Sequence, residues 1–342
     1  MAVGIAAALT AAVAWAVAST LIAHWAARVD AFSLSFIRAV WALLFLFIAG
    51  ALLGADSYAR MSISDIAQLA AAGFLATGLA QTLYAITIPM LGLTPTFTIT
   101  AGGQVVFAYL FGALVINDRV TWQAGVGSAL VILGVYIVAM YGRPRLRPSQ
   151  PTRLTAAFRL SRALRGGSPP IAGAGRQTDD MPATTTPWRA AAVRLAWMPA
   201  HHQAFGLILA VAMSVLWGTT TVWVRHAAAD FEAAAATSVR MPIVALFLLV
   251  VALAQPTSDL RRRTLPRSSH LPLALSGILG TGVTGLFIVV SLHHVGAGEF
   301  TVLFSTAPLF GMLLAAIFLR ERITVWLFGG ALLVVGGIAL LA

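Results

Sequence analysis

The chain has 342 residues, of which 59% are hydrophobic and only 10% charged, and its mean hydropathy is +0.89. A soluble domain carries about 25% charged residues, so this composition excludes an ordinary soluble protein and favours a membrane protein. The net charge is +11 and every basic residue is arginine. Most arginines lie in one linker and in short turns, which favours an anionic membrane surface over nucleic acid as their partner.

Windows of about 19 residues identify ten apolar segments along the chain. Each is close to the roughly 20 residues that a helix needs to cross a hydrocarbon layer about 30 Å thick. Short turns with charged or turn-forming residues separate them. We therefore predict an all-α membrane protein with ten transmembrane helices. The predicted spans are 3–26, 32–54, 65–88, 94–116, 122–141, 204–226, 233–254, 271–291, 298–318 and 323–342.

The stretch between the fifth and sixth spans, residues 142–203, has a different composition. It is rich in Arg, Pro, Ser, Thr and Gly, as in "GRPRLRPSQPTRL", and we predict a linker outside the membrane. Two pieces of it, "AAFRLSRALR" and "WRAAAVRLAW", have the pattern of basic amphipathic helices that lie on anionic lipid. The alternative is a disordered linker with no role beyond its length.

The second half of the chain repeats the first. When the halves are displaced by 202 residues, Trp15 aligns with Trp217. With a displacement of 203, Arg119 aligns with Arg322, so the turn "NDRVT" has its counterpart in "RERIT". The repeat aligns several unusual residues at once, which makes it a stronger signal than any single motif.

The repeat defines the domain organisation and its symmetry. We predict a first five-span repeat at 1–141, the linker at 142–203 and a second five-span repeat at 204–342. Because five is odd, the second repeat must begin on the opposite face of the membrane, so the repeats are inverted. Inverted repeats are typical of secondary transporters, which bind substrate where the halves meet and expose it to each side in turn.

Two stretches of the second half also resemble a known family. "SVLWGTTTVWVRHAAADFEAAAATSVRMP" has the Trp-Gly in its first helix and the early Arg in its second that are typical of an EamA-type unit. "GAGEFTVLFSTAPLFGMLLAAIFLRERIT" is similar to the fourth helix of that unit, with a Pro inside the helix and a Glu-Arg-Ile-Thr turn. The resemblance covers both halves, all but the linker, and it points to the drug/metabolite transporter superfamily.

The resemblance implies a ten-helix carrier around a central cavity, in a plasma membrane of bacterial type, that moves amino acids or other metabolites, and it favours export over import. The first copy departs from the family pattern. It has Ala16 in place of the Gly and Val105 in place of the Pro, and Asp118 stands where the second copy has Glu321. We therefore expect the two halves to move differently.

Several polar or aromatic residues inside the spans are candidates for the cavity. Trp lies more often at the membrane surface than in the middle of a span, and helical spacing places the other candidates in polar stripes. The alternatives are packing between the repeats, with Trp N–H bonded to a backbone carbonyl, and hydrogen bonds between helices. The second-half counterparts of the stripes are mostly less polar, which suits an asymmetric small molecule. The candidates are Trp15, Ser19, Thr77, Gln81, Tyr84, Thr100, Gln104, Trp217 and Thr221.

Charged residues within spans are functional candidates as well. Arg38 and Arg240 are related by the repeat, and each either contacts substrate or holds the fold together at a helix end. Glu299 lies at the start of the predicted span 298–318, close to His294. It forms either a proton relay with the histidine or a stabilising charge at a helix N-terminus.

No enzyme signature is present: the sequence has no HExxH, no GxSxG and no lysine for a phosphate loop. We expect no catalytic activity, no metal and no cofactor, and the expected partners are a small-molecule substrate and the lipid bilayer. One alternative is a non-transporting or flippase-like protein that acts on lipid-linked substrates, which a polar cleft open sideways to lipid would favour. Another is a membrane scaffold whose linker recruits a partner.

The charge distribution predicts an orientation. The linker shares one face with turns that hold Arg28, Arg261, Arg262, Arg263, Arg267, Arg320 and Arg322, whereas the other face has only Arg60, Arg119 and Arg225. The positive-inside rule then places the linker in the cytoplasm and both termini outside. The resemblance implies the reverse orientation.

Overall fold

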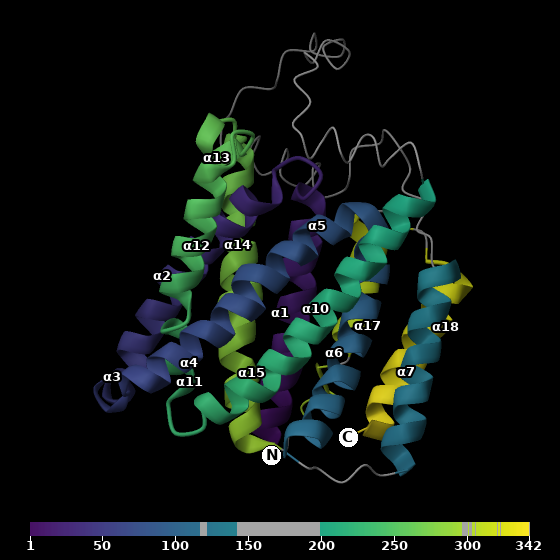
Figure 1. The fold of residues 1–342 in the computed structure, drawn as a ribbon, viewed down its shortest axis with the longest axis horizontal. Helices are drawn as coiled ribbons and strands as arrows, with labels where there is room; N and C mark the ends of the chain where they lie inside the picture. The colour runs from purple at the N-terminus through teal and green to yellow at the C-terminus, as the bar shows by residue number, and fades with distance from the viewer. Residues whose placement is uncertain are drawn as a thin grey trace.

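The computed structural model describes residues 1–116, 122–141, 199–295, 300, 303–304, 306–319, 321 and 323–341. All regular secondary structure in these residues is helical, and the helices form one bundle (Figure 1). Both marked chain ends lie at one end of the bundle, the end toward which the short helix α3 (Ala55–Arg60) also lies. The short helix α13 (Asp259–Arg262) lies at the opposite end.

The first half forms long helices with few breaks. Its third segment runs without interruption from Ile63 to Leu91 and includes a π-helical stretch, η1. The elements are α1 (Ala2–Trp25), α2 (Ala31–Leu53), α3, α4 (Ile63–Gly73), η1 (Phe74–Ala80), α5 (Gln81–Leu91), α6 (Leu93–Ile116) and α7 (Trp122–Tyr141).

The second half follows the same order. Its elements are α10 (Pro199–Ala227), α11 (Ala233–Ser238), α12 (Met241–Ala254), α13, η2 (Arg267–Ser269), α14 (His270–Gly277), the π-helical η3 (Ile278–Val283), α15 (Thr284–His294), α17 (Ala307–Leu314), the π-helical η4 (Ala315–Leu319) and α18 (Val325–Leu341).

Six helical segments of the described chain are long and apolar enough to cross a membrane. They are Ala2–Trp25, Ala31–Leu53, Ile63–Leu91, Gln203–Val224, Ala233–Ala254 and Arg267–Ser291, and three shorter apolar helices cover Gly125–Val138, Ala307–Leu319 and Val325–Leu340. All begin within or close to spans predicted from sequence, and α6 occupies the predicted span 94–116.

One predicted span differs from the structure in its interior. The predicted helix 233–254 is divided, because α11 ends at Ser238 and α12 begins at Met241. Pro242 has no N–H to donate and its ring clashes with the preceding turn, so a helix breaks there. The first half has Val40 at the corresponding place, and α2 is continuous. The break leaves Arg240 at the junction of two helices.

The helices of the two halves pack against one another in a reciprocal pattern. α1 packs against α15 and α17 of the second half, and α10 packs against α5 and α6 of the first half. α2 packs against α12, and α7 packs against α18, so these helices contact their own counterparts. The largest hydrophobic cluster contains residues of both halves, and therefore the core lies between them.

The α7–α18 contact is unusually close. A β-carbon at Gly134 would lie 2.6 Å from the carbonyl oxygen of Gly330, and one at Gly337 would lie 2.6 Å from that of Gly127. Small residues let helix backbones approach in this way inside membranes. Glycine is thus required at Gly134 and Gly337 by the space available.

A turn of the second half caps a helix of the first. The carboxylate of Glu321 accepts a hydrogen bond from the backbone N–H of Leu93 at 2.9 Å and from the Thr94 hydroxyl at 2.8 Å. Leu93 is the first residue of α6, whose N–H groups have no partner within the helix. The "RERIT" turn therefore holds the N-terminus of α6, which explains a carboxylate at this position.

Candidate functional site

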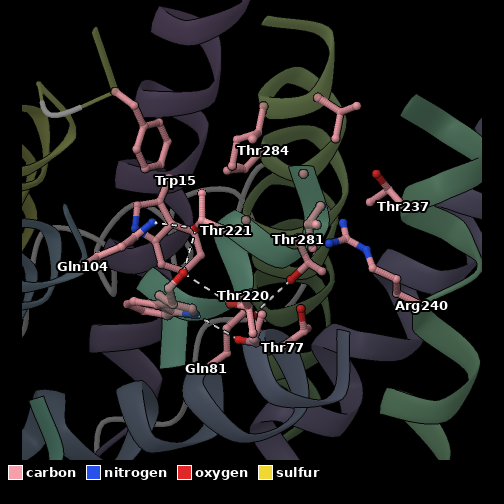
Figure 2. Close-up of a pocket in the computed structure, with 18 of the residues that line it drawn as sticks. Trp15, Thr77, Gln81, Gln104, Thr220, Thr221, Thr237, Arg240, Thr281 and Thr284 are labelled. Atoms are coloured by element: carbon pink, nitrogen blue, oxygen red, sulfur yellow. Dashed lines mark hydrogen bonds between the residues drawn. The ribbon is translucent and has the colours of Figure 1, made fainter. Parts of the chain in front are cut away.

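A cavity of about 160 Å³ lies at the centre of the bundle, between the two halves (Figure 2). Its wall is formed by α1, η1, α5 and α6 of the first half and by α10, α11, η3 and α15 of the second. The side chains that can form hydrogen bonds there are Trp15, Thr77, Gln81, Gln104, Trp217, Thr220, Thr221, Thr237, Arg240, Thr281 and Thr284.

Two tryptophans related by the repeat meet at the cavity. The rings of Trp15 and Trp217 lie edge to face, with centroids 5.8 Å apart, and Tyr84 packs behind them at 5.6 Å from each. The indole N–H of Trp217 donates to the carbonyl oxygen of Ala76 in η1 at 3.0 Å. The two roles that the sequence offered as alternatives for Trp217 therefore occur together. Its ring lines the cavity, and its N–H bonds a backbone carbonyl of the other half.

Two further hydrogen bonds join the halves across the cavity wall. The amide nitrogen of Gln104 donates to the hydroxyl of Thr221 at 3.3 Å, and the hydroxyl of Thr281 donates to the amide oxygen of Gln81 at 3.2 Å. In each pair the amide belongs to the first half and the hydroxyl to the second. These neutral groups offer both donors and acceptors to a small polar ligand.

Several of the other predicted site residues are placed away from the cavity. Ser19 and Tyr84 are fully buried, and Tyr84 is covered by the two tryptophans. Thr100 is also buried, and its hydroxyl donates to the carbonyl oxygen of Thr96 one turn earlier, at 2.8 Å. The hydroxyl proton of Thr100 is thus used within its own helix. Ser19, Tyr84 and Thr100 are not among the residues that line the cavity.

Of the predicted proton relay, the structure describes only His294. His294 is exposed, and its Nδ1 lies 2.9 Å from the carbonyl oxygen of Val290. Glu299 lies outside the described residues. Within the described part of the chain, no group of three or more His, Asp or Glu side chains is placed to hold a metal ion.

The two arginines related by the repeat have different surroundings. Arg38 is 1% exposed, and its Nε donates to the hydroxyl of Ser276 at 2.9 Å. It does not line the cavity, so it fits the structural role. Arg240 does line the cavity, and Figure 2 shows its guanidinium directed inward toward Thr281.

Four polar lining residues were missed in the sequence. Thr220 belongs to the run "GTTTVW", Thr237 stands three residues before Arg240, and Thr281 and Thr284 lie in and just after η3. The run of threonines beside Trp217 was the clearest signal. Thr237, Thr281 and Thr284 were harder to identify. Alignment of the halves pairs Tyr84 with Phe287 and Gln104 with Ala307, so the second half looked less polar than the first.

Comparisons with known proteins agree with this architecture. The model of the EamA-like transporter family matches residues 2–140 and 204–342. A solved structure titled only "Crystal structure of protein" superposes with a TM-score of 0.57 at 16% identity, covering 98% of this chain and 96% of that one. At this identity the likeness shows the fold alone.

Two curated relatives match part of the chain. An "Uncharacterized transporter" of Archaeoglobus fulgidus is 29% identical over 34% of this chain and 40% of its own length. A "Probable terminal-alkyne amino-acid exporter" of Streptantibioticus cattleyicolor is 30% identical over 42% of this chain and 46% of its own length. The match thus spans less than half of either relative. The family match covers both halves, and with the apolar helices it shows that this multi-pass membrane protein belongs to the EamA-like transporter family.

Proposed function

We propose that this protein is a secondary transporter that exports a small metabolite, such as an amino acid, by alternating access through the central cavity. The observation that carries the proposal is the cavity itself, which both halves line with polar groups and with Trp15 and Trp217. Transporters built from repeats bind substrate at such an interface, because motion between the halves there exposes the site to one side and then to the other.

The proposal also includes the architecture: ten spans arranged as two inverted repeats, at 1–141 and 204–342. A two-fold axis in the membrane plane exchanges each helix with its counterpart, so helices next to the axis contact their own counterparts. The α2–α12 and α7–α18 contacts have this property. The contact of α1 with α15 and that of α10 with α5 are exchanged by the same axis. Both pairs of contacts fit a two-fold relation between the repeats, and an odd number of spans in each repeat would make that relation an inverted one.

The size of the cavity supports a small substrate. Its volume of about 160 Å³ is below the roughly 300–1,000 Å³ that is usual for sites of drug-sized ligands. The printed name of the relative from Streptantibioticus cattleyicolor, an amino-acid exporter, is consistent with this size. A second hollow lies beside Phe47, Tyr58, Ile66 and Leu246 and is lined almost entirely by apolar residues. A lipid-linked substrate would need a polar cleft there instead.

We further propose that the linker at 142–203 lies in the cytoplasm and that the protein resides in the plasma membrane. The α13 end of the bundle carries Arg261 and Arg262 and lies opposite the chain ends (Figure 1). A reporter fused after residue 342 that is active only outside the cell tests this orientation. Activity of a cytoplasm-specific reporter at the same position would reverse it.

The first test of the function is the thermal stability of the purified protein with amino acids, sugars, nucleotide sugars, cationic drugs and lipids. A ligand at about 100 times its dissociation constant adds about 2.7 kcal/mol to the stability of the folded state. We expect one class of small metabolite to stabilise the protein, and Gln81→Ala to reduce the effect. The same metabolite should then be transported in proteoliposomes. Stabilisation by lipid-linked molecules alone would contradict the proposal.

Deletion of residues 150–195, which lie outside the described structure, separates a carrier from a scaffold. A carrier that uses the central cavity keeps transporting without them. Loss of transport by a deletion variant that still folds would assign the linker a direct part in function.

A further inference from the structure

Arg38 and Arg240 occupy the same place in the repeat, and the segments of the opposite half on which they pack differ at one position. A β-carbon at Gly277 would overlap the backbone of Arg38, and one at Gly73 would overlap the side chain of Arg240. Each arginine therefore packs on a glycine of the opposite half, at the end of α14 or of α4. The residue before Gly277 is Ser276, whereas the residue before Gly73 is Ala72.

With serine at one position and alanine at the other, only one of the two arginines finds a hydrogen-bond partner there. Ser276 accepts a hydrogen bond from Nε of Arg38, and its own hydroxyl donates to the carbonyl oxygen of Ala18 at 3.2 Å. The methyl group of Ala72 cannot replace this hydroxyl. Within the described residues, no hydrogen bond or ion pair engages the side chain of Arg240.

The guanidinium of Arg240 lies inside the cavity. One of its terminal nitrogens would be 3.9 Å from a β-carbon at Gly285, a lining residue on the neighbouring helix α15. Among the described lining residues, Arg240 is the only ionisable group. A guanidinium that has left water without an anionic partner is costly. The described wall of the cavity therefore carries the positive charge of Arg240 and no negatively charged side chain.

We propose that Arg240 binds the carboxylate of the transported substrate, which makes organic carboxylates the substrate class. This inference rests on the proposed transport function. A guanidinium offers paired N–H donors that match the two oxygens of a carboxylate. The apolar part of the substrate then lies toward Trp15, Ile288 and Phe304 on the remaining wall. Cationic molecules without a carboxylate are disfavoured, because they would meet a like charge.

The test compares ligands that differ only at the carboxylate. The probes are free amino acids, the corresponding amino-acid amides and the corresponding amines, each titrated against the purified full-length protein by thermal stability. We expect the acid to bind about 10- to 100-fold more tightly than its amide, the range for a hydrogen bond to a charged group. In Arg240→Gln the acid should lose this advantage, while the affinity for the amide stays within about twofold. A merely structural role of Arg240 would lower both affinities together.

Three variants keep the test independent of a folding failure in Arg240→Gln. Arg240→Lys keeps the charge and should retain a weaker preference for the acid. Ala72→Ser offers Arg240 the hydroxyl that Arg38 has, and it should weaken acid binding without removing the charge. Arg38→Gln is the matched control, which removes an equivalent arginine outside the cavity and should leave the preference for the acid unchanged.

Equal affinity for acid and amide in the unmodified protein would overturn the assignment, as would an unchanged preference for the acid in Arg240→Gln. A protein that no carboxylate stabilises would overturn it too. If that protein still transports a neutral or cationic solute in proteoliposomes, the proposed function stands and only the role of Arg240 fails. If it transports nothing, both fail.

Discussion

The indole N–H of Trp217 donates to the carbonyl oxygen of Ala76 across the boundary between the two halves, at 3.0 Å. Its counterpart Trp15 presents a similar ring to the cavity, but within the described residues its N–H makes no hydrogen bond. The two tryptophans therefore share a position in the repeat and differ in the bond that fixes them.

This difference predicts unequal effects of the same substitution. Trp217→Phe removes the donor and leaves the Ala76 carbonyl without this partner, which we expect to cost about 1 kcal/mol of stability. Trp15→Phe should cost less. Both should reduce ligand affinity, because both rings line the cavity. Thermal unfolding and uptake by proteoliposomes measure the two effects, and transport that neither variant alters would show that the cavity is not the transport path.

A second prediction concerns the ends of the helices. Asp30 caps α2 by accepting hydrogen bonds from the backbone N–H of Phe32 and Ser33, and it also accepts one from Asp259 at 2.8 Å. Asp30→Ala should lower the free energy of unfolding by about 1–2 kcal/mol or more, the usual cost of losing a cap. Asp56→Ala removes an exposed aspartate at the opposite end and should change it by less than about 0.5 kcal/mol. Equal losses for the two variants would contradict the capping role.

The Glu321 cap gives a third prediction. In Glu321→Ala the backbone N–H of Leu93 and the hydroxyl of Thr94 both lose their acceptor in a buried site, at about 1–3 kcal/mol for each unsatisfied group. Thr94→Val removes only the hydroxyl and should cost less. Unfolding in detergent measures both. If Thr94→Val is the more damaging variant, the N-terminus of α6 does not depend on the carboxylate.

Glycine substitutions supply a fourth prediction, about packing. Gly277→Ala should destabilise the protein by about 1–3 kcal/mol, because the new methyl group would overlap the backbone of Arg38. Gly336→Ala is the control: nothing lies within 4 Å of its β-carbon position. Since alanine is the better helix residue by about 0.5–1 kcal/mol, Gly336→Ala should be neutral or stabilising. A comparable loss in both variants would mean that helix propensity, not packing, decides the outcome.

The helices could be predicted from the sequence because the requirement for a span is local. About 20 apolar residues suffice, and the repeat supplied an independent check. Trp15, Gln81 and Gln104 could be predicted as cavity residues for a similar reason, as polar or aromatic groups in apolar surroundings. Spacing along a helix gives the direction in which a side chain points but not what covers it. Tyr84 was therefore misplaced, since Trp15 and Trp217 lie over it.

The contrast between Arg38 and Arg240 could not be predicted from their own segments. Pro242 marks a helix break beside Arg240, but the hydrogen-bond partner that distinguishes the two arginines comes from the opposite half, with Ser276 beside Arg38 and Ala72 at the matching position for Arg240. Such pairings join residues more than 160 positions apart. They become visible only when the chain is folded.

Among the described residues, equivalent contacts at the two ends of the bundle join the halves through different numbers of hydrogen bonds. At the α13 end, the backbone N–H of Asp30 donates to the carboxylate of Asp259 and the N–H of Asp259 donates to that of Asp30. The hydroxyl of Ser33 also bonds the hydroxyl of Ser258 and accepts from the N–H of Leu260. At the equivalent place near α3, the bonds between the halves are those of Ser57 with the N–H of Glu232 and of Tyr58 with Ser238. Each bond is worth about 0.5–1.5 kcal/mol. For a carrier of the proposed kind, the empty protein would rest closed at the α13 end, and the substrate would supply the energy that reverses this bias.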